Sequence, residues 1–399
     1  MPVYLDHAAT TAVLPAVVER VAEQMGGLGN ASSLHTAGRA SRRVVEESRE
    51  TIAAALGARP SEVVFTSGGT EADNLAVVGT YRRRRADDPS RNRLLVSAVE
   101  HHAVLDCVEH LVAHEGARVT WLEVDGEGRV DPGTVRAAIE QQPDDVALVS
   151  VMWANNEVGT VQPVREIAAI AHEHDIPFHT DAVQAVGQIP VDFGESGADL
   201  LALTGHKIGG PLGVGVLVAR RDAALEPLTY GGGQERQIRS GTLDTPAIAG
   251  LAVAVDHAVG HLHEHAAHLA SLRDKLVHGA TAAGYGITVS GPYEVGDVTR
   301  RLPGNAHLRV PDCEGDSLLY LLDAAGVECS TGSACQAGVP QPSHVLLAMG
   351  VPEAQARGAL RLTLGHTSTD ADVEAFLAAL PAAVERAQRA HRASRGSGR

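Results

Sequence analysis

The stretch VVFTSGGTEADNLAVVGTYRR, residues 63–83, decides the fold class of this chain. Its first four residues, VVFT, are typical of a short buried strand. Two glycines follow at positions 68 and 69, and a pattern of helical period begins at Glu71. A strand, a glycine turn and a helix in direct succession are typical of an α/β protein with a parallel sheet.

The same alternation of short apolar runs and longer helical patterns continues to about residue 220. We therefore predict a mostly parallel seven-stranded sheet between helices, and such a sheet binds its ligands beyond the carboxyl ends of its strands. The other six predicted strands are RLLVS (93–97), RVTWL (118–122), VALVSV (146–151), PFHT (177–180), DLLAL (199–203) and GVLVA (215–219).

The pattern changes after residue 220, where a long helical pattern runs from about Thr245 to Ala283. NAHLRV, the segment around GVECS and RLTLG then look like strands, with SLLYLLDAA and SHVLLAMG as helices between them. This predicts a second, smaller α+β domain. We expect residues 15–258 to form the large domain. Residues 1–14 and 259–399 would form the small one, with a cysteine-bearing loop at about 328–340.

Composition excludes several classes of protein. The chain has 33 Lys and Arg against 49 Asp and Glu among 399 residues, a formal charge of −16 that argues against a nucleic-acid surface. No apolar run has the length of a membrane span, and MPVYLDHAATT lacks the basic and apolar parts of a secretion signal, so we expect a cytoplasmic protein. The histidines of HLHEHAAHL (261–269) suit the wet side of an amphipathic helix, and we predict no metal site there.

Two motifs with anion-binding and amine chemistry follow predicted strands. In SGGTEADN (67–74) the backbone at Gly69 and the hydroxyl of Thr70 suit an anion at a helix start, although a plain capped turn explains the motif equally well. In TGHK (204–207), Lys207 comes just after a buried strand. Partial burial there would lower its pKa and favour a Schiff base, and the alternative is a surface lysine in a loop.

Three further polar groups belong to the same predicted edge of the sheet. Asp181 ends the strand PFHT, and a buried carboxylate there needs a cation such as a protonated pyridine nitrogen, unless it merely caps a helix. His101 follows RLLVS and could stack on a planar ring or move protons near neutral pH. Asn155 and Asn156 supply amides after VALVSV. Each residue alone has a structural explanation, but together they favour a cofactor site.

The stretch STGSACQAG (330–338) sets Cys335 among small residues that cannot anchor a loop in a core. Cys329 ends the apolar stretch GVEC, and we predict that it is a buried strand residue. A metal site at these two cysteines lacks a CxxC or HxH partner. Cys335 is therefore predicted as a nucleophile on a poorly ordered loop.

The motifs resemble those of the fold-type I pyridoxal-phosphate enzymes, and specifically the cysteine desulfurases of the NifS and IscS kind (group I). The resemblance covers almost the whole chain in order. It runs through YLDHAATT, SGGTEADN, VEHHAVL, NNEVGTVQP, HTDAVQAVG, TGHKIGGPLGVG, GGGQERQIRSGT, STGSAC and LRLTLG. It implies an aspartate aminotransferase-like fold and conversion of L-cysteine to L-alanine. The sulfur would pass to Cys335 as a persulfide, for delivery to an acceptor protein in iron–sulfur cluster assembly or thiolation.

The resemblance also implies roles for individual residues. Lys207 would form the Schiff base with pyridoxal phosphate, Asp181 would pair with the pyridine nitrogen and His101 would stack on the ring. Cys335, Lys207 and His101 would be the catalytic residues. The remaining implied cofactor contacts are Gln184 and Asn156 at the ring oxygen, and Gly69, Thr70, Thr204 and His206 at the phosphate.

Two implied roles concern the substrate and a second subunit. Arg361, together with Asn156, would bind the substrate carboxylate, a task suited to a two-pronged guanidinium. Thr242 would reach the phosphate of the neighbouring subunit, so the resemblance implies an obligate homodimer with shared active sites. L-cysteine and a sulfur-acceptor protein would be the other partners.

The sequence departs from the family pattern at four places. TGHK stands where many relatives have SGHK, and Gly69 stands where alanine is frequent; we expect little effect from either. His366 replaces a frequent arginine, and QAGVPQPS replaces a serine-rich segment, which leaves the sulfur acceptor open. It could serve iron–sulfur clusters, tRNA thiolation, DNA phosphorothioation or a natural product. A selenocysteine lyase, another β-elimination lyase and a scaffold subunit remain alternative functions.

Overall fold

A seven-stranded sheet forms the centre of the computed structural model, which describes residues 2–332 and 341–396. The strand order is β2-β8-β7-β6-β5-β3-β4, and only β8 runs antiparallel to its neighbours. All seven predicted strands and the mostly parallel sheet are confirmed. The strands are β2 (Val63–Thr66), β3 (Arg93–Ser97), β4 (Arg118–Leu122), β5 (Val146–Ser150), β6 (Phe178–Asp181), β7 (Leu200–Thr204) and β8 (Gly215–Ala219).

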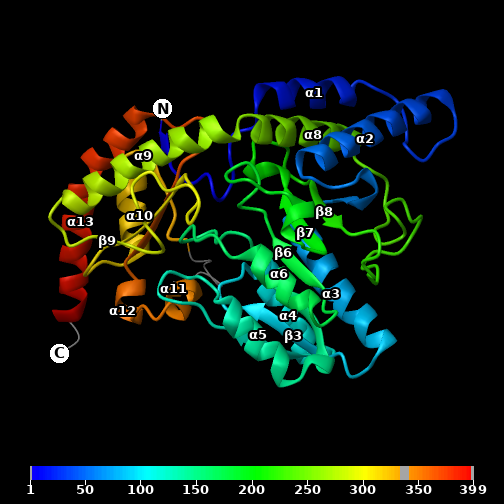
Figure 1. Cartoon of the computed structure of the whole chain (residues 1–399). Coiled ribbons are helices and arrows are strands. Elements are labelled where there is room, and N and C mark those ends of the chain that lie inside the picture. Colours follow the sequence, from blue (N-terminus) through cyan, green and yellow to red (C-terminus); the bar gives the residue numbers. More distant parts are fainter. Residues whose placement is uncertain (1, 333–340, 397–399) are drawn as a thin grey trace.

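Helices cover both faces of this sheet (Figure 1). Side chains alternate along a strand, so Val63 and Phe65 pack on one face of β2 while Val64 packs on the other. The first face meets α1 (Pro15–Met25), α2 (Thr36–Ala55), α5 (Pro132–Gln141), α6 (Val164–His172) and α8 (Thr245–Gly260). The second face meets α3 (Gly69–Asp87) and α4 (His102–His114).

A smaller sheet with its own core follows in the C-terminal part. In it, β10 (Asn305–Arg309) pairs antiparallel with β9 (Thr288–Val289) and β12 (Ala359–Thr363). The N-terminal β1 (Val3–Tyr4) pairs with β11 (Val327–Glu328), so the first residues join this part. The helices are α9 (Leu262–Ala282), α10 (Gly315–Asp323), α11 (His344–Ala348), α12 (Glu353–Ala356) and α13 (Asp370–Gly396), besides the short α7 (Phe193–Ser196) near the large sheet. The predicted division at residues 15–258 stays a prediction.

Two features differ from the sequence-based expectations. The helical pattern from Thr245 to Ala283 is two helices, because His261 leaves the helical conformation, with φ −107° and ψ 10°. Figure 1 shows α8 above the large sheet and α9 continuing toward α13. Cys329 follows β11 and is half-buried instead of lying inside a strand.

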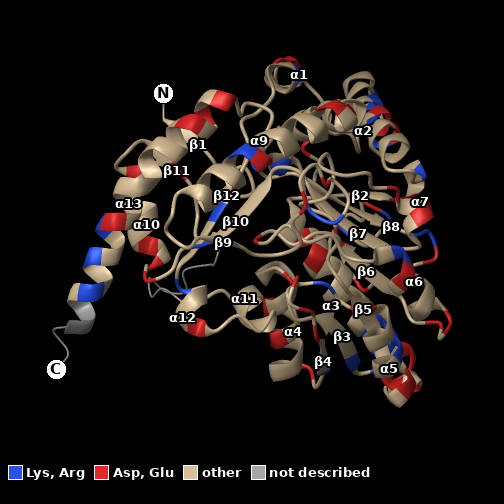
Figure 2. Ribbon diagram, turned by 60° about the vertical axis from the view of Figure 1, so that its left-hand side comes forward, with Lys and Arg blue, Asp and Glu red and all other residues tan. Residues whose placement is uncertain are grey.

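Charges of both signs are spread over the outer helices. Figure 2 shows acidic and basic residues beside one another on α5 and α6, whereas on α13 the basic residues gather toward the C-terminal end. Within residues 2–332 and 341–396, none of the helices has both the length and the apolarity needed to cross a bilayer.

Candidate active site

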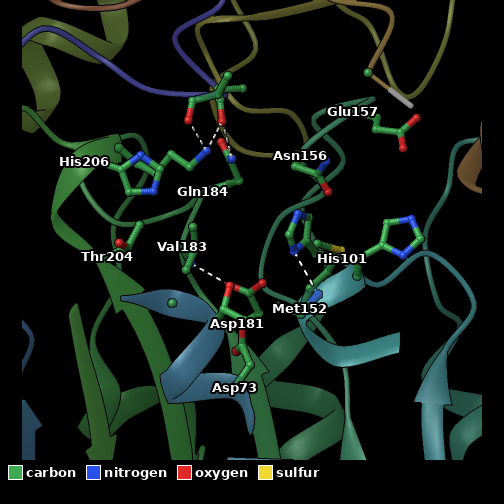
Figure 3. A pocket seen from close by; sticks show the side chains of 18 of the residues that line it. Asp73, His101, Met152, Asn156, Glu157, Asp181, Val183, Gln184, Thr204 and His206 are labelled. Atoms are coloured by element: carbon green, nitrogen blue, oxygen red, sulfur yellow. Dashed lines mark hydrogen bonds between the residues drawn. The ribbon is translucent and has the colours of Figure 1, made fainter. Parts of the chain in front are cut away.

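A cavity of about 410 Å³ lies at the carboxyl ends of the large sheet's parallel strands. Ser330, Gly332 and Arg361 of the small-sheet region also border it, so the cavity lies between the two sheets. Figure 3 shows polar side chains from several strand ends pointing into it. The predicted site residues that line it are Gly69, Thr70, His101, Asn156, Asp181, Gln184, Thr204, His206, Lys207 and Arg361.

The glycine turn before α3 forms one wall. Gly68 has φ 152° and ψ −178°, a backbone conformation that glycine alone adopts readily. A Cβ atom at Gly69 would come within 2.7 Å of Val183 Cγ2, so the glycine at this position is matched to Val183. We expected little effect from glycine at this position, where alanine is frequent in the family, but this contact shows that the residue type affects local packing. The first turn of this 19-residue helix leaves backbone N–H groups available to an anion.

Lys207 ends a short 3₁₀ turn, Gly205–Lys207, directly after β7. Its Nζ donates hydrogen bonds to Ala9 O at 2.7 Å and to Ala8 O. Burial and the nearby charge of Arg361 lower the pKa of the Lys207 amine to about 8. The predicted lowering of this pKa is confirmed, and part of the amine is neutral near pH 7.

Asp181 is the last residue of β6 and is only 5% exposed. One carboxylate oxygen accepts a hydrogen bond from Val183 N at 2.8 Å, which closes a turn and not a helix cap (Figure 3). Burial raises the pKa of Asp181 to about 6, and the Val183 hydrogen bond and the charge of Lys207 oppose that rise. Among the described residues this carboxylate has one hydrogen bond, from its own turn, and a buried carboxylate of this kind is suited to a cationic ligand.

His101 is the N-cap of α4, and its Nδ1 accepts a hydrogen bond from Ala103 N at 3.1 Å. The ring therefore carries its hydrogen on Nε2 when neutral. Burial and the charge of Lys207 lower the pKa of His101 to about 4. Water in the open cavity reaches the ring and weakens this effect, while a ligand that excludes the water would strengthen it. The expectation that His101 moves protons near neutral pH stays a prediction, and a neutral ring also suits stacking.

Arg361 projects from β12 into the cavity. Its Nη2 donates to Asp6 Oδ1 at 2.8 Å and its Nη1 donates to Asn156 O at 3.1 Å. These two contacts fix the plane of the guanidinium, and such a group binds a carboxylate through two parallel hydrogen bonds.

The amide side chains near the cavity have different functions. Asn155 is fully buried, and it donates to Val99 O and accepts from the backbone N–H groups of Glu157 and Val158, so it stabilises the loop after β5. Gln184 lines the cavity and donates to Ala8 O at 3.0 Å.

Two predicted site residues are not among those that line the cavity. Thr242 is exposed in the loop before α8. Cys335 and the predicted disorder of its loop fall in residues 333–340, outside the described residues. The described chain reaches the cavity at Ser330 and Gly332, immediately before that segment.

Comparison with known proteins identifies the family. Residues 3–376 match the family model of class-V aminotransferases. The chain belongs to the class-V aminotransferase family. An IscS-like cysteine desulfurase from Mycobacterium tuberculosis is 57% identical over 396 residues, which cover 99% of this chain and all of that relative.

Solved structures of class-V aminotransferase relatives have the same fold. A NifS-like protein matches with a TM-score of 0.85 and 34% identity, over 97% of this chain and 99% of that one. SspA in complex with cysteine matches with a TM-score of 0.78 and 34% identity, over 92% and 99% of the two chains.

Class-V aminotransferases use pyridoxal phosphate, and the cavity residues fit this cofactor. The first turn of α3 leaves backbone N–H groups that a phosphate can bind. Asp181 is a buried carboxylate suited to the pyridine nitrogen, and Lys207 is an amine with a lowered pKa suited to the aldehyde.

Sequence reasoning missed several cavity residues of this class-V aminotransferase. Glu157 is 2% exposed, and its Oε2 accepts a hydrogen bond from Ser343 Oγ. Burial raises the pKa of Glu157 to about 7. Asp73, His102 and His344 also line the cavity. The glutamate stands in the NNEVG motif, where Val158 was the only apolar neighbour in the sequence that could signal its burial.

Proposed function

We propose that this protein is a pyridoxal-phosphate-dependent cysteine desulfurase that converts L-cysteine to L-alanine and transfers the sulfur to Cys335. The observation that carries this proposal is one cavity that joins the amine of Lys207, the buried carboxylate of Asp181 and the guanidinium of Arg361. The identity of 57% to an IscS-like cysteine desulfurase supports the same reaction.

Side chains of the cavity would hold the cofactor at three points. Lys207 would bind its aldehyde carbon, Asp181 its pyridine nitrogen, and His101 would stack on the ring. When bound, pyridoxal phosphate supplies an electron-accepting ring that delocalises the electron pair left by a broken Cα–H bond. The other proposed contacts are Gln184 and Asn156 for the ring oxygen, and Gly69, Thr70, Thr204 and His206 for the phosphate.

Arg361 binds the substrate carboxylate in this proposal, and Asn156 lies beside it. Because Asp6 and the Asn156 carbonyl already orient the guanidinium, little side-chain freedom is lost when the substrate arrives. Lys207, once displaced by the substrate amine, takes the α-proton. A pKa of about 8 suits this transfer, because the amine is neutral often enough to accept a proton and basic enough to hold it.

Cys335 then attacks the sulfur of the bound substrate. An S–S bond forms on Cys335 and the C–S bond of the substrate breaks, so that Cβ takes up one proton, and Lys207 returns the α-proton to Cα to complete alanine. The proton that leaves the Cys335 thiol needs a temporary acceptor. His101, Lys207 and Glu157 all line the cavity and are the candidates for that acceptor.

Further parts of the proposal concern assembly and partners. Two chains would form a homodimer, and Thr242 of each would reach the phosphate of the other, which agrees with its exposure outside its own cavity. The persulfide would pass to an acceptor protein in iron–sulfur cluster assembly or thiolation, in the cytoplasm.

The test is to incubate the purified protein with L-cysteine and a thiol and to measure alanine and sulfide. We expect both products from the wild type and from Cys329→Ser, a matched control. Cys335→Ser should keep the cofactor absorbance and lose both products. Borohydride should fix the cofactor on the peptide that contains Lys207. A Cys335→Ser variant that desulfurates L-cysteine at the normal rate would overturn the sulfur-transfer step, and rates on L-cysteine and L-selenocysteine with and without Cys335 separate a desulfurase from a β-elimination lyase.

A further inference from the structure

Three carboxyl groups lie together beneath the cavity. Asp73 of α3 is 1% exposed, Glu100 after β3 is fully buried and Asp181 of β6 is 5% exposed. Figure 3 shows Asp73 directly below Asp181, on the side toward the sheet. Since like charges repel strongly in a buried site, the three groups do not all ionise together.

His179 of β6 links Asp73 to a hydroxyl group. Its Nε2 lies 3.4 Å from Asp73 Oδ1, and its Nδ1 lies 2.9 Å from Ser150 Oγ. Among the described residues, neither Nε2 nor Asp73 Oδ1 has a hydrogen-bond partner, and their own 3.4 Å contact is an ion-pair distance and not a well-formed hydrogen bond. Both atoms are fully buried, so each needs the other to satisfy its hydrogen-bonding capacity.

The position of one hydrogen decides how this pair is satisfied. A neutral His179 that donates from Nδ1 to Ser150 Oγ has a lone pair on Nε2, and Asp73 must then supply a proton. Burial raises the pKa of Asp73 well above its usual range, and Asp181 and Glu100 add to that effect. Burial also lowers the pKa of His179 to about 3, so the imidazole stays neutral.

Glu100 is the third member of the group. Its Oε1 accepts a hydrogen bond from Met152 N at 2.6 Å, while Oε2 has no partner among the described residues. Burial and the neighbouring Asp181 raise its pKa well above the usual range. The positive charge of Lys207 lowers the pKa of Asp181 but does not act in this way on the other two carboxyl groups. With a pKa of about 6, Asp181 is the carboxyl group of the three that ionises near neutral pH.

We propose that Asp73 is a positioning residue: as a neutral acid it donates a hydrogen bond to His179, which donates in turn to Ser150, and this neutral chain confines the negative charge to Asp181. The inference rests on the proposed function, because the confined charge would face the pyridine nitrogen of the cofactor. An ionised Asp73 would instead hold a proton on Asp181 through repulsion.

The test compares Asp73→Asn with Asp73→Ala. The amide is neutral and keeps an N–H donor for His179, so its bound cofactor should titrate in the visible spectrum at the wild-type pH. Asp73→Ala leaves His179 Nε2 unpaired and should weaken cofactor binding about tenfold. Asp87→Asn, on an exposed part of the same helix, should change neither quantity.

An ionised Asp73 would give a different result. Asp73→Asn would then remove a negative charge near the ring and lower the pKa of the visible band by about one unit or more. That shift would overturn the inference, as would tight cofactor binding by Asp73→Ala.

Infrared spectra of the full chain at pH 7 provide a readout that does not depend on the cofactor. The difference between wild type and Asp73→Asn should contain the carbonyl stretch of a protonated carboxyl group, and a carboxylate stretch in its place would overturn the inference. A wild-type chain that takes up no pyridoxal phosphate would refute the proposed function, while this spectrum would still decide the protonation of Asp73.

Discussion

Replacing Glu157 by glutamine should make the protein more stable at alkaline pH. Burial raises the pKa of Glu157 from its ordinary 4.5 to about 7, so the folded chain binds this proton more tightly than the unfolded chain does. The contribution of Glu157 to stability is therefore greatest below pH 4.5 and falls as pH rises to 7. At about 1.4 kcal/mol for each pKa unit, the wild type loses about 3 kcal/mol over this range. Glutamine avoids that loss and can still bond to Ser343.

Urea unfolding followed by tryptophan fluorescence measures this effect. At pH 5 we expect wild type and Glu157→Gln to have similar free energies of unfolding. At pH 8.5 the variant should exceed the wild type by about 3 kcal/mol. Glu109→Gln, at an exposed position of α4, should follow the wild type at both values. A Glu157→Gln variant that is equally destabilised at both pH values would refute the reasoning, because it would show a charge-independent role.

Three other changes have defined outcomes. Arg361→Lys removes the two-pronged donor and should raise KM for L-cysteine about tenfold or more, with a smaller change in kcat. An unchanged KM in initial-rate assays would contradict this role of Arg361. Gly69→Ala brings a methyl group within 2.7 Å of Val183 Cγ2 and should weaken cofactor binding, measured by spectral titration, and adding Val183→Ala should restore it. Burial lowers the pKa of His7 and of His265 to about 4, so the folded state disfavours their protonation and loses stability as pH falls from about 6.5 toward 4. Replacing both by glutamine should flatten this acid side of a urea-unfolding series, and an unchanged slope would contradict the assignment.

Strand burial explains why the large sheet could be predicted from sequence. Every residue of β7 (Leu200–Thr204) is buried, and a strand covered on both faces has an apolar signature that needs no knowledge of its neighbours. The two-residue strands β1 and β9 carry no such signature, because pairing with distant segments defines them. The break at His261 separates two helices that pack on different parts of the fold, and local helix propensity does not reveal it.

The site residues that could be predicted from sequence are those that directly follow a buried strand. Lys207 and Asp181 stand at the carboxyl ends of strands. Because ligands bind at that edge of a parallel sheet, the sequence alone predicted that these two residues share one site. Asp73 stands in EADN at the start of a helix, a position where a carboxylate usually faces solvent. Only the packing of α3 against β6 buries it beside His179. Glu157 was hidden in the same way, because its partner Ser343 is far away in the sequence.

The most direct test of the proposed function is a single turnover without added thiol. The holoenzyme is mixed with one equivalent of L-cysteine per chain, alanine is quantified, and the peptides are examined by mass spectrometry. We predict about one alanine per chain and one extra sulfur atom on the peptide that contains Cys335. Continued alanine formation with an unmodified Cys335 peptide would contradict sulfur transfer to this residue.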